Sequence, residues 1–498
     1  MKIKFVLSLI VFLVITNFNL VSQTNWTKYS DNPVKSPGAQ PTCIYDNDTI
    51  KMWYATAHYG IARIKGAWSL DGINWNDYND GNPVMELGAD GEWDRGWHDT
   101  PEVVKDDDGY KMYYYGDTAY IIIWTISTYD SITCAIGLAT SQDGINWEKY
   151  SENPVITKGD SASFDGRWIE SPALYYDSNS SEYFMWYTGM GWNWLTQIGL
   201  ARSDCGFIWN KYDENPVISE GPSGTYDDMW VSVPAVIKTD DIYEMWYSAF
   251  RSVYGWDSLT IAYAVSLNGI YWIKYPENPV YNQYFPPYVH ENDSTGAWAP
   301  DVVYIPGTNS YMMFYDGASG INMAASPRNV LYSENCNISV SENITIEQGQ
   351  NTNLLATGGD YYHWLPEESL SNPYIADPVA SPDTTTTYTV LIVSDSCITT
   401  AQITVTVEEP QQIMSNNTGN IRVYPNPFKD KTVIEFPFEY NNEYILNIYD
   451  IYGKAVRTIT GINTGQIIIY KKTLTSGIYF FMLNNYDKCI ASGKLIID

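Results

Sequence analysis

The sequence has few cysteines, few basic residues and only one long apolar run. Six cysteines in 498 residues are too few for a disulfide scaffold, and none has the Cys-x-x-Cys spacing of a zinc site. The 28 basic residues stand against 58 acidic ones, and the net charge of −30 argues against nucleic acid and anionic membranes as partners. No motif indicates a metal or a cofactor, and we expect none.

The one long apolar run lies at the N-terminus. Lys2 and Lys4 precede an apolar core from Phe5 to Ile15, and Ser22 fits a cleavage point. Residues 1–22 therefore have the pattern of a signal peptide, which predicts export. No later run is long enough to cross a membrane as a helix. In an oxidising compartment Cys336 and Cys397, which bracket one segment, could form a disulfide.

The rest of the chain is organised around a phrase that occurs five times. Its fullest form is Trp-x-Lys-Tyr-x-x-Asn-Pro-Val, and its Asn-Pro-Val parts begin at Asn32, Asn82, Asn153, Asn215 and Asn278. Successive copies are 50, 71, 62 and 63 residues apart. A recurring period of this size indicates one supersecondary unit that is used several times.

Each unit contains the same parts in the same order. A proline opens an apolar stretch, a Met-aromatic-Tyr run follows, and a strand of small residues ends in Ser before a Gly turn. Four short strands per unit, rich in aromatic and β-branched residues, are typical of a propeller blade. The sequence therefore predicts an all-β protein with a five-bladed β-propeller over residues 23–332. We interpret the repeated aromatic residues first as packing between blades.

The two ends of the repeat predict how the propeller closes. The fifth unit reaches Ser326 and then meets Pro327, without a Gly turn or a Trp. The chain instead begins with an isolated Trp26-Thr27-Lys28-Tyr29. We expect this N-terminal strand to complete the last blade, because an unclosed propeller would leave strand edges open.

Residues 333–409 lose the Met-aromatic-Tyr run and alternate like the strands of a small β-sandwich. The stretch from Gly358 to Pro366 resembles the immunoglobulin-like or PKD-like spacer domains of secreted bacterial proteins. We interpret this domain as a spacer, with a carbohydrate-binding module as the alternative. A polar linker at 410–420 follows it.

Residues 421–498 contain four stretches in a characteristic order. They are Val423 to Phe428, Ile448 to Gly453, Leu474 to Phe480, and Lys494 to Asp498. The segment resembles the type A C-terminal sorting domain of the type IX secretion system of Bacteroidetes. That resemblance implies the type IX machinery as a partner, passage through the outer membrane, and release or attachment at the cell surface.

Comparison of the units with one another points to candidate catalytic residues. Residues just before each inner-strand proline should crowd around the propeller axis. Two blades have carboxylates there, Asp99 and Glu170, where others have Ser232 and Gln40. Carboxylates around a funnel suit glycoside hydrolysis, which needs a protonated acid for the leaving oxygen and a base for water.

These segments resemble the five-bladed glycosidase superfamily that includes glycoside hydrolase families 32, 43, 62, 68 and 130. The segment Glu170-Ser171-Pro172 is similar to the one whose Glu is the general acid in families 32 and 43. His98-Asp99-Thr100-Pro101 is similar to the one whose Asp tunes that acid and holds the substrate. The resemblance implies a secreted glycoside hydrolase that acts on a poly- or oligosaccharide, with Glu170 as the acid and Asp99 as its partner.

One position departs from that pattern. Families 32 and 43 have their base or nucleophile Asp before the first inner-strand proline, where this chain has Gln40, which cannot act as a base. Around the ring, Asp301, Asp99 and Glu170 lie two steps and then one step apart, as the three acids do in those families. We therefore expect Asp301 to be the third catalytic carboxylate, although it follows its proline; a turn cap is the alternative.

Further substrate contacts are expected from loops that open on the same face. These loops offer His58, Asp117, Trp192, Trp194, Arg251 and Asp316, and His98 and Gln40 add to them from the inner strands. The two tryptophans break the repeat, which favours sugar stacking. The competing hypothesis is a non-catalytic propeller that binds glycans at the cell surface, and Gln40 favours it. A family 130-like phosphorylase fits export poorly, because free phosphate and the energy of a sugar phosphate are useful inside the cell.

Overall fold

The structure is a computed structural model that describes most of the chain. The described residues are 26–58, 61–118, 133–239, 241–251, 259–281, 296–327, 336–395, 397–408, 421–439, 443–485 and 488–498. The signal peptide predicted at 1–22 and the linker predicted at 410–420 lie outside them. The chain divides into two compact units, Met1–Val407 and Glu408–Asp498, and each is described by itself.

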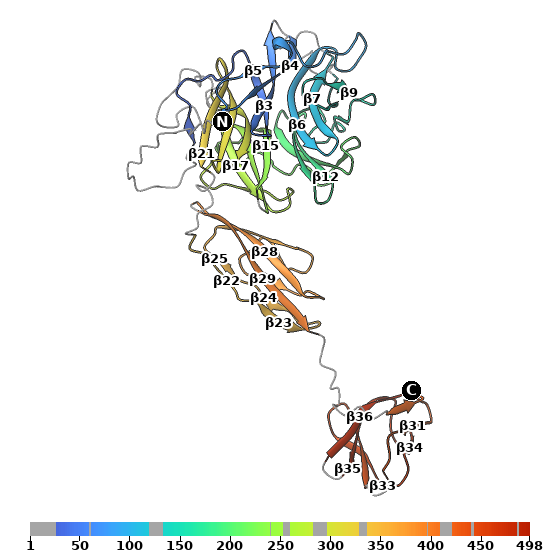
Figure 1. The fold of residues 1–498 in the computed structure, drawn as a ribbon. Coiled ribbons are helices and arrows are strands. Elements are labelled where there is room, and N and C mark those ends of the chain that lie inside the picture. The colour runs from blue at the N-terminus through green and yellow to red at the C-terminus, as the bar shows by residue number, and fades with distance from the viewer. Residues whose placement is uncertain are drawn as a thin grey trace, which may run out of the picture. The chain divides into compact units, whose positions relative to one another are not determined.

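Five four-stranded antiparallel blades form the propeller of the larger unit (Figure 1). Blade 1 contains β2 (Ala39–Asp46), β3 (Thr49–His58), β4 (Ile61–Ser69) and β5 (Asn76–Asp77). Blade 2 contains β6 (Trp97–Asp106), β7 (Gly109–Asp117), β8 (Cys134–Ser141) and β9 (Glu148–Lys149), and the short β10 (Ile156–Thr157) also pairs with β8. Blade 3 contains β11 (Trp168–Asp177), β12 (Glu182–Met190), β13 (Thr196–Ser203) and β14 (Asn210–Lys211).

Blades 4 and 5 complete the ring. Blade 4 contains β15 (Trp230–Thr239), β16 (Ile242–Phe250), β17 (Thr260–Ser266) and β18 (Ile273–Lys274). Blade 5 contains β19 (Trp298–Ile305), β20 (Ser310–Gly317), β21 (Gly320–Pro327) and the N-terminal β1 (Thr27–Lys28). The innermost strands contact one another in the order β2, β6, β11, β15, β19 and back to β2. The five-bladed fold predicted from the repeat is therefore confirmed.

The N-terminal strand closes the propeller as the ends of the repeat predicted. Thr27 pairs with Ala325 and Lys28 with Ala324, in antiparallel register at the outer edge of blade 5. Trp26 is buried beside this strand and packs edge-on against Trp246 of blade 4, at 6.2 Å between ring centroids. The last blade therefore joins the two ends of the propeller sequence.

The repeated aromatic residues pack between blades. In each of three blades the central aromatic residue of the Met-aromatic-Tyr run donates a hydrogen bond to a Gly-turn carbonyl of the next blade. The pairs are Trp53 with Gly144, Tyr113 with Gly206 and Trp186 with Gly269, at 2.9, 2.6 and 2.8 Å. The packing interpretation is confirmed for these side chains, which are fully buried.

The Asn-Pro-Val phrase fastens a loop to its own blade. The Asn32 side chain accepts a hydrogen bond from the N–H of Met323 and donates one to the carbonyl of the same residue. Asn153, Asn215 and Asn278 do the same with Leu138, Leu200 and Tyr263. Asn82 instead donates to the carbonyl of Asn79, because its copy contains the longer loop and a 3-10 turn at Asn79–Gly81.

The sandwich that follows the propeller is built from β22 to β29 (Figure 1). Its largest sheet has the order β23 (Ile344–Glu347), β29 (Ile398–Glu408), β28 (Thr386–Val393) and β26 (Tyr361–Leu365). Two smaller pairs join β22 (Ser339–Val340) to β25 (Ala356–Thr357) and β24 (Thr352–Asn353) to β27 (Val379–Ala380). A disulfide joins Cys336 to Cys397, whose Cα atoms are 5.6 Å apart.

The sandwich packs against the propeller. Leu391 and Val393 belong to the same buried cluster as Trp26 and Tyr275 of the propeller. The Tyr275 hydroxyl also donates a 2.5 Å hydrogen bond to the carbonyl of Asp395. This domain therefore contributes to the core of the larger unit, which a freely jointed spacer would not do.

The smaller unit is a β-sandwich with its own core. One sheet has the order β30 (Arg422–Tyr424), β31 (Lys431–Glu435), β34 (Gln466–Tyr470). The other has the order β33 (Ala455–Ile462), β32 (Tyr444–Tyr449), β35 (Gly477–Asn485), β36 (Lys488–Ile497). Phe428, Ile434, Leu446 and Phe481 are buried between them. No helix in the described residues is both long enough and apolar enough to cross a membrane.

Candidate active site at the propeller axis

Every inner strand carries the same distortion at its proline. The residue before the proline has a positive φ in all five blades, between 39° and 50°, and none of the five is glycine: Gln40, Thr100, Ser171, Val233 and Ala299. The strand register slips at the same place in each blade. A bulge re-aims the side chains around it, and left-handed backbone at non-glycine residues is concentrated at functional sites.

The five bulges surround the axis. Together with their prolines they line a cavity of about 20 Å³, which has room for one water. The bulge also separates two levels of side chains. Asp99 pairs across the blade with Tyr115, whereas Glu102 pairs with Tyr113. Because these partners are two residues apart, the two levels lie about 7 Å apart along the strand.

Asp99 and Glu170 occupy the same level on neighbouring blades. Each carboxylate accepts a hydrogen bond of 3.0 Å from an indole two residues earlier, Asp99 from Trp97 and Glu170 from Trp168. Burial raises the pKa of Asp99 to about 6. Burial, with a further contribution from the Asp99 charge, raises the pKa of Glu170 to about 7. Both residues keep part of their surface accessible, so both carboxyl groups can exchange protons with solvent. The two residues singled out from the sequence therefore lie on the same level of neighbouring blades.

Asp301 lies on the other level. Its Oδ2 accepts a 2.6 Å hydrogen bond from the backbone N–H of Cys43, and it lines the axial cavity with Glu102. Burial raises the pKa of Asp301 to about 7, and burial together with the Asp301 charge raises the pKa of Glu102 well above its ordinary value. Glu102 in turn accepts hydrogen bonds from Thr42 and from the N–H of Leu174. The structure therefore pairs Asp301 with Glu102 and separates it from Asp99 and Glu170.

A different carboxylate of blade 5 lies near the first level. Asp316 on β20 is 3% exposed, and burial raises its pKa well above its ordinary value, with the Asp99 charge adding to the effect. Asp99 therefore acts electrostatically on both Glu170 and Asp316. Going round the ring, Asp316, Asp99 and Glu170 lie on blades 5, 2 and 3, which is the spacing of two steps and then one that was expected of Asp301.

Asp316 was expected among the loop residues that contact substrate and not as a catalytic carboxylate, and the structure places it within β20 (Ser310–Gly317). The sequence does contain a signal for it. The residue three positions after each repeated Met is Ala55, Tyr115, Thr188, Ser248 and Asp316 in blades 1 to 5, so only the last blade has an acid there.

The remaining expected contacts are distributed between the interior and the rim. His98 is fully buried, lies 2.9 Å from Asp94 and has a pKa lowered by burial, so it belongs to the interior of blade 2 and not to a substrate surface. Asp117 is fully buried and accepts a 2.7 Å hydrogen bond from the Tyr115 hydroxyl. Gln40 lines the axial cavity, and Arg251 directly follows β16.

Two tryptophans are exposed at the end of blade 3 that carries Glu170. Trp192 is 48% exposed and Trp194 is 42% exposed, although both are large apolar side chains. The guanidinium of Arg167, itself buried, lies 3.2 Å from the ring centroid of Trp194 and 5.4 Å from that of Trp192. The hairpin that carries both rings joins β12 to β13, at the strand ends where Trp168 pairs with Met190. The rings therefore lie at the same end of blade 3 as Glu170.

The described residues contain no group of three His, Cys, Asp or Glu side chains placed to hold a metal ion. What they do place together is a set of carboxyl groups with unequal, raised pKa values. At neutral pH Asp99 is more ionised than Glu170. A protonated carboxyl beside an ionised one is the requirement for general acid catalysis with an anionic partner.

The smaller unit has a family assignment. Residues 422–498 match the family described as secretion system C-terminal sorting domain. The resemblance stated from this segment is confirmed. The chain is exported through the type IX secretion system to the cell surface or outside the cell.

Relatives of the larger part are distant. Over 196 residues, or 38% of this chain, the sequence is 26% identical to an uncharacterized protein of Mycobacterium tuberculosis, and it spans 58% of that protein's length. Over 226 residues, or 41% of this chain, it is 24% identical to the A type blood N-acetyl-alpha-D-galactosamine deacetylase of Flavonifractor plautii, of which it spans 28%.

Solved structures with a similar fold include glycoside hydrolases. A glycosyl hydrolase of Bacteroides ovatus matches with 16% identity and a TM-score of 0.48, over 61% of this chain and 94% of that one. A thermostable family-43 glycoside hydrolase matches with 17% identity and a TM-score of 0.45, over 60% and 91% of the two chains.

Proposed function

We propose that the propeller is a secreted glycoside hydrolase that cleaves a poly- or oligosaccharide, with Glu170 as the general acid. The observation that carries this proposal is the pair Asp99 and Glu170, which lie on adjacent inner strands with pKa values raised to about 6 and about 7. The indoles of Trp97 and Trp168 hold the two carboxyl groups in place. Trp192 and Trp194 supply rings on which a sugar can stack.

In the proposed reaction Glu170 gives its proton to the oxygen of the leaving sugar, and Asp99 remains anionic beside the developing positive charge. A second carboxylate is needed on the opposite side to activate a water or to attack the sugar. We assign this role to Asp316 in place of Asp301, because the Asp99 charge acts on Asp316, whereas Asp301 lies on the other level, where it accepts the N–H of Cys43.

The test is a screen of the full chain against a panel of polysaccharides, reading reducing ends. Glu170→Gln keeps the side-chain shape but removes the acid. A general acid contributes about 100- to 10,000-fold, so this variant should lose at least about 100-fold in turnover on any substrate found. The loss should shrink on substrates with an activated leaving group, which need less protonation. Hydrolysis that survives Glu170→Gln would show that the acid lies elsewhere.

The second candidate function is glycan binding without hydrolysis. Gln40 favours it, because it lines the axis where a base was expected. Binding of a polysaccharide without any release of reducing ends would support this candidate. The same screen should also measure the release of acetate, because the relative from Flavonifractor plautii is an N-acetyl-alpha-D-galactosamine deacetylase.

A further inference from the structure

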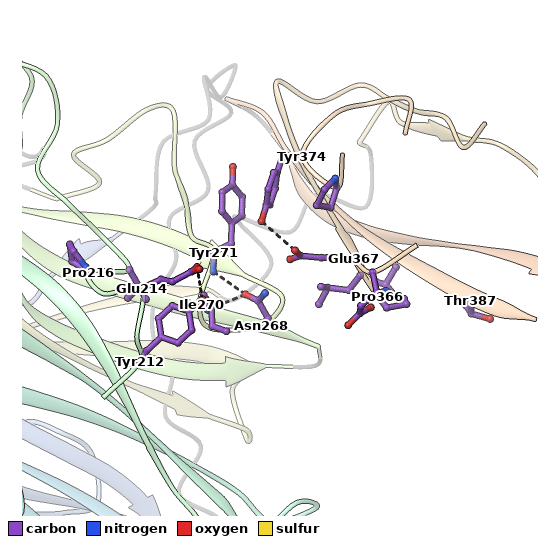
Figure 2. Close-up of a pocket in the computed structure, with 15 residues that line it drawn as sticks. Tyr212, Glu214, Pro216, Asn268, Ile270, Tyr271, Pro366, Glu367, Tyr374 and Thr387 are labelled. Carbon is purple, nitrogen blue, oxygen red and sulfur yellow. Dashed lines mark hydrogen bonds between the residues drawn. The ribbon is translucent and has the colours of Figure 1, made fainter. Parts of the chain in front are cut away.

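A groove with a volume of about 1080 Å³ is lined jointly by the outer edge of blades 3 and 4 and by the sandwich (Figure 2). The propeller contributes the loop after β14 and the turn before β18, including Tyr212, Glu214 and Tyr271. The sandwich contributes the end of β26 and the loop that follows, including Glu367 and Tyr374. None of the carboxylates at the propeller axis lines this groove.

The aromatic walls of the groove are held rigidly. Tyr271 of the propeller packs against Tyr374 of the sandwich, at 4.2 Å between ring centroids and 32° between ring planes. His363 is fully buried beneath them, with its centroid 4.9 Å from that of Tyr271, and lies 2.9 Å from a Glu367 oxygen. Side chains that are already held in place lose less conformational entropy when a ligand binds.

Comparison of the blades shows that Tyr271 is not required by its own turn. The same position holds Asn74 in blade 1 and Asn146 in blade 2, and both amides donate a 2.8 Å hydrogen bond to the Asp of the turn. In blade 4 the turn is kept by Asn268, whose Oδ1 accepts the N–H groups of Ile270 and Tyr271. The turn therefore does not require the Tyr271 side chain, which packs on Tyr374 and His363 at the groove instead.

The groove combines rings with hydrogen-bond acceptors. Tyr374 is 41% exposed, and its hydroxyl donates to Glu367 at 3.4 Å. Tyr212 donates to the exposed Glu214 at 3.0 Å. Rings beside a few fixed polar groups suit a sugar, whose C–H face stacks on the ring while its hydroxyls donate to the carboxylates. Because the charged side chains lining the groove are acidic, and the whole chain has a net charge of −30, an anionic sugar would be repelled.

We propose that this groove is a second carbohydrate-binding site, which takes a segment of a neutral polysaccharide outside the propeller funnel. The proposal takes only its class of ligand from the proposed function. A polysaccharide held here keeps other segments of the same molecule close to the funnel, so the local concentration of cleavable bonds rises without any new contact at the axis.

The test is affinity electrophoresis of the full chain in gels that contain xylan, arabinan, mannan or laminarin as neutral probes. Alginate and polygalacturonate serve as anionic probes. The Glu170→Gln protein is used so that the probes stay intact.

At least one neutral probe should retard the migration of the Glu170→Gln protein, and the anionic probes should not. Tyr374→Ala should weaken the retarding interaction about tenfold, the range of a lost ring contact. Tyr374→Phe should retain it, because the ring remains.

Tyr361→Ala is the matched control, because Tyr361 is 48% exposed on the same β26 strand region but does not line the groove. It should leave retardation unchanged. No retardation by any neutral probe, or retardation that Tyr374→Ala leaves intact, would overturn the proposal. So would an equal loss in Tyr361→Ala. Hydrolysis by the unaltered chain is measured separately. Cleavage without Tyr374-dependent binding would refute only the proposed binding site in the groove. Tyr374-dependent binding without cleavage would refute only the proposed hydrolase activity.

Discussion

The backbone N–H of Gln40 donates a 2.6 Å hydrogen bond to Oδ1 of Asp316, and this contact joins blade 1 to blade 5. The same junction exists elsewhere in the ring with a hydroxyl as the acceptor. Thr188 accepts the N–H of Val233, and Ser248 accepts the N–H of Ala299, both at 2.8 Å. A hydroxyl is therefore sufficient for the junction, and the carboxylate of Asp316 is more than packing requires.

This comparison defines a substitution that separates structure from catalysis. Asp316→Ser keeps an oxygen that can accept the Gln40 N–H, as Ser248 does in blade 4, but removes the carboxylate. We expect turnover to fall at least about 100-fold, the contribution of a missing acid or base, while Tm stays close to that of the unaltered chain. Ser248→Thr is the control and should change neither quantity. Full turnover in Asp316→Ser would reduce Asp316 to a blade junction.

The pH dependence of kcat/KM should be a narrow bell. Glu170 must hold its proton, so activity should fall as the pH rises above about 7. Asp99 and Asp316 must both be ionised, so activity should also fall as the pH drops, at about 6 through Asp99 and also through Asp316, whose pKa is raised as well.

Each limb of that bell can be moved separately. The Trp168 indole stabilises the ionised form of Glu170, so Trp168→Phe should raise its pKa and move the alkaline limb up by about one pH unit, as expected for one charge-assisted hydrogen bond. Trp97→Phe should instead move the acid limb upward by acting on Asp99. An alkaline limb that stays in place in Trp168→Phe would remove Glu170 from the acid role.

The repeat made the propeller predictable, because the sequence pattern of one four-stranded blade occurs five times. The same comparison also singled out Asp99 and Glu170, since these residues differ from their counterparts in other blades, and the structure places the two on one level. Asp301 lies on the other level, because counting from the proline ignores the bulge. The slip in register places residues after the proline on a separate level, so Asp301 has Glu102 as its counterpart, and Asp99 has Trp298.

Contacts that depend on the tertiary structure were beyond the sequence. His98 precedes Asp99 by one position, yet its side chain faces Asp94 and Tyr114 inside the blade, because neighbouring residues of a strand point to opposite faces. The packing of the sandwich on the propeller likewise joins Tyr275 to Asp395, which are 120 residues apart. No local sequence pattern predicts either contact.

The Glu102–Asp301 pair should make stability depend on pH. Both pKa values are raised in the folded state, so the folded chain holds protons that the unfolded chain releases near pH 4. Their contribution to stability is full below about pH 4 and is lost as the pH rises through about 7. Glu102→Gln keeps an oxygen for the Leu174 N–H and an amide that can donate to Thr42, and it removes the repulsion.

We therefore expect Glu102→Gln to be more stable than the unaltered chain at pH 8, by on the order of 1 kcal/mol, with no gain at pH 4.5. Denaturant unfolding at the two pH values measures this difference. Glu86→Gln is the control, because Glu86 is 83% exposed and its ion pair with Arg63 is solvated. A gain of equal size at both pH values would point to packing and not to titration.

The closing strand should be the weakest junction of the ring, since β1 pairs over only two residues and has no covalent link to blade 5. Asn32 adds two hydrogen bonds to Met323, at 2.8 and 3.0 Å, and is 5% exposed. Asn32→Ala leaves the buried N–H of Met323 without this partner, at a cost of about 1 to 3 kcal/mol, whereas the Met323 carbonyl keeps its hydrogen bond from the N–H of Tyr29. Hydrogen exchange in β21 should therefore accelerate at least tenfold.

Asn278→Ala is the control. It removes the same two bonds inside blade 4, whose strands are covalently continuous, and it should leave exchange in β21 unchanged. Equal protection of β21 in both variants would mean that the ring is not held at this seam.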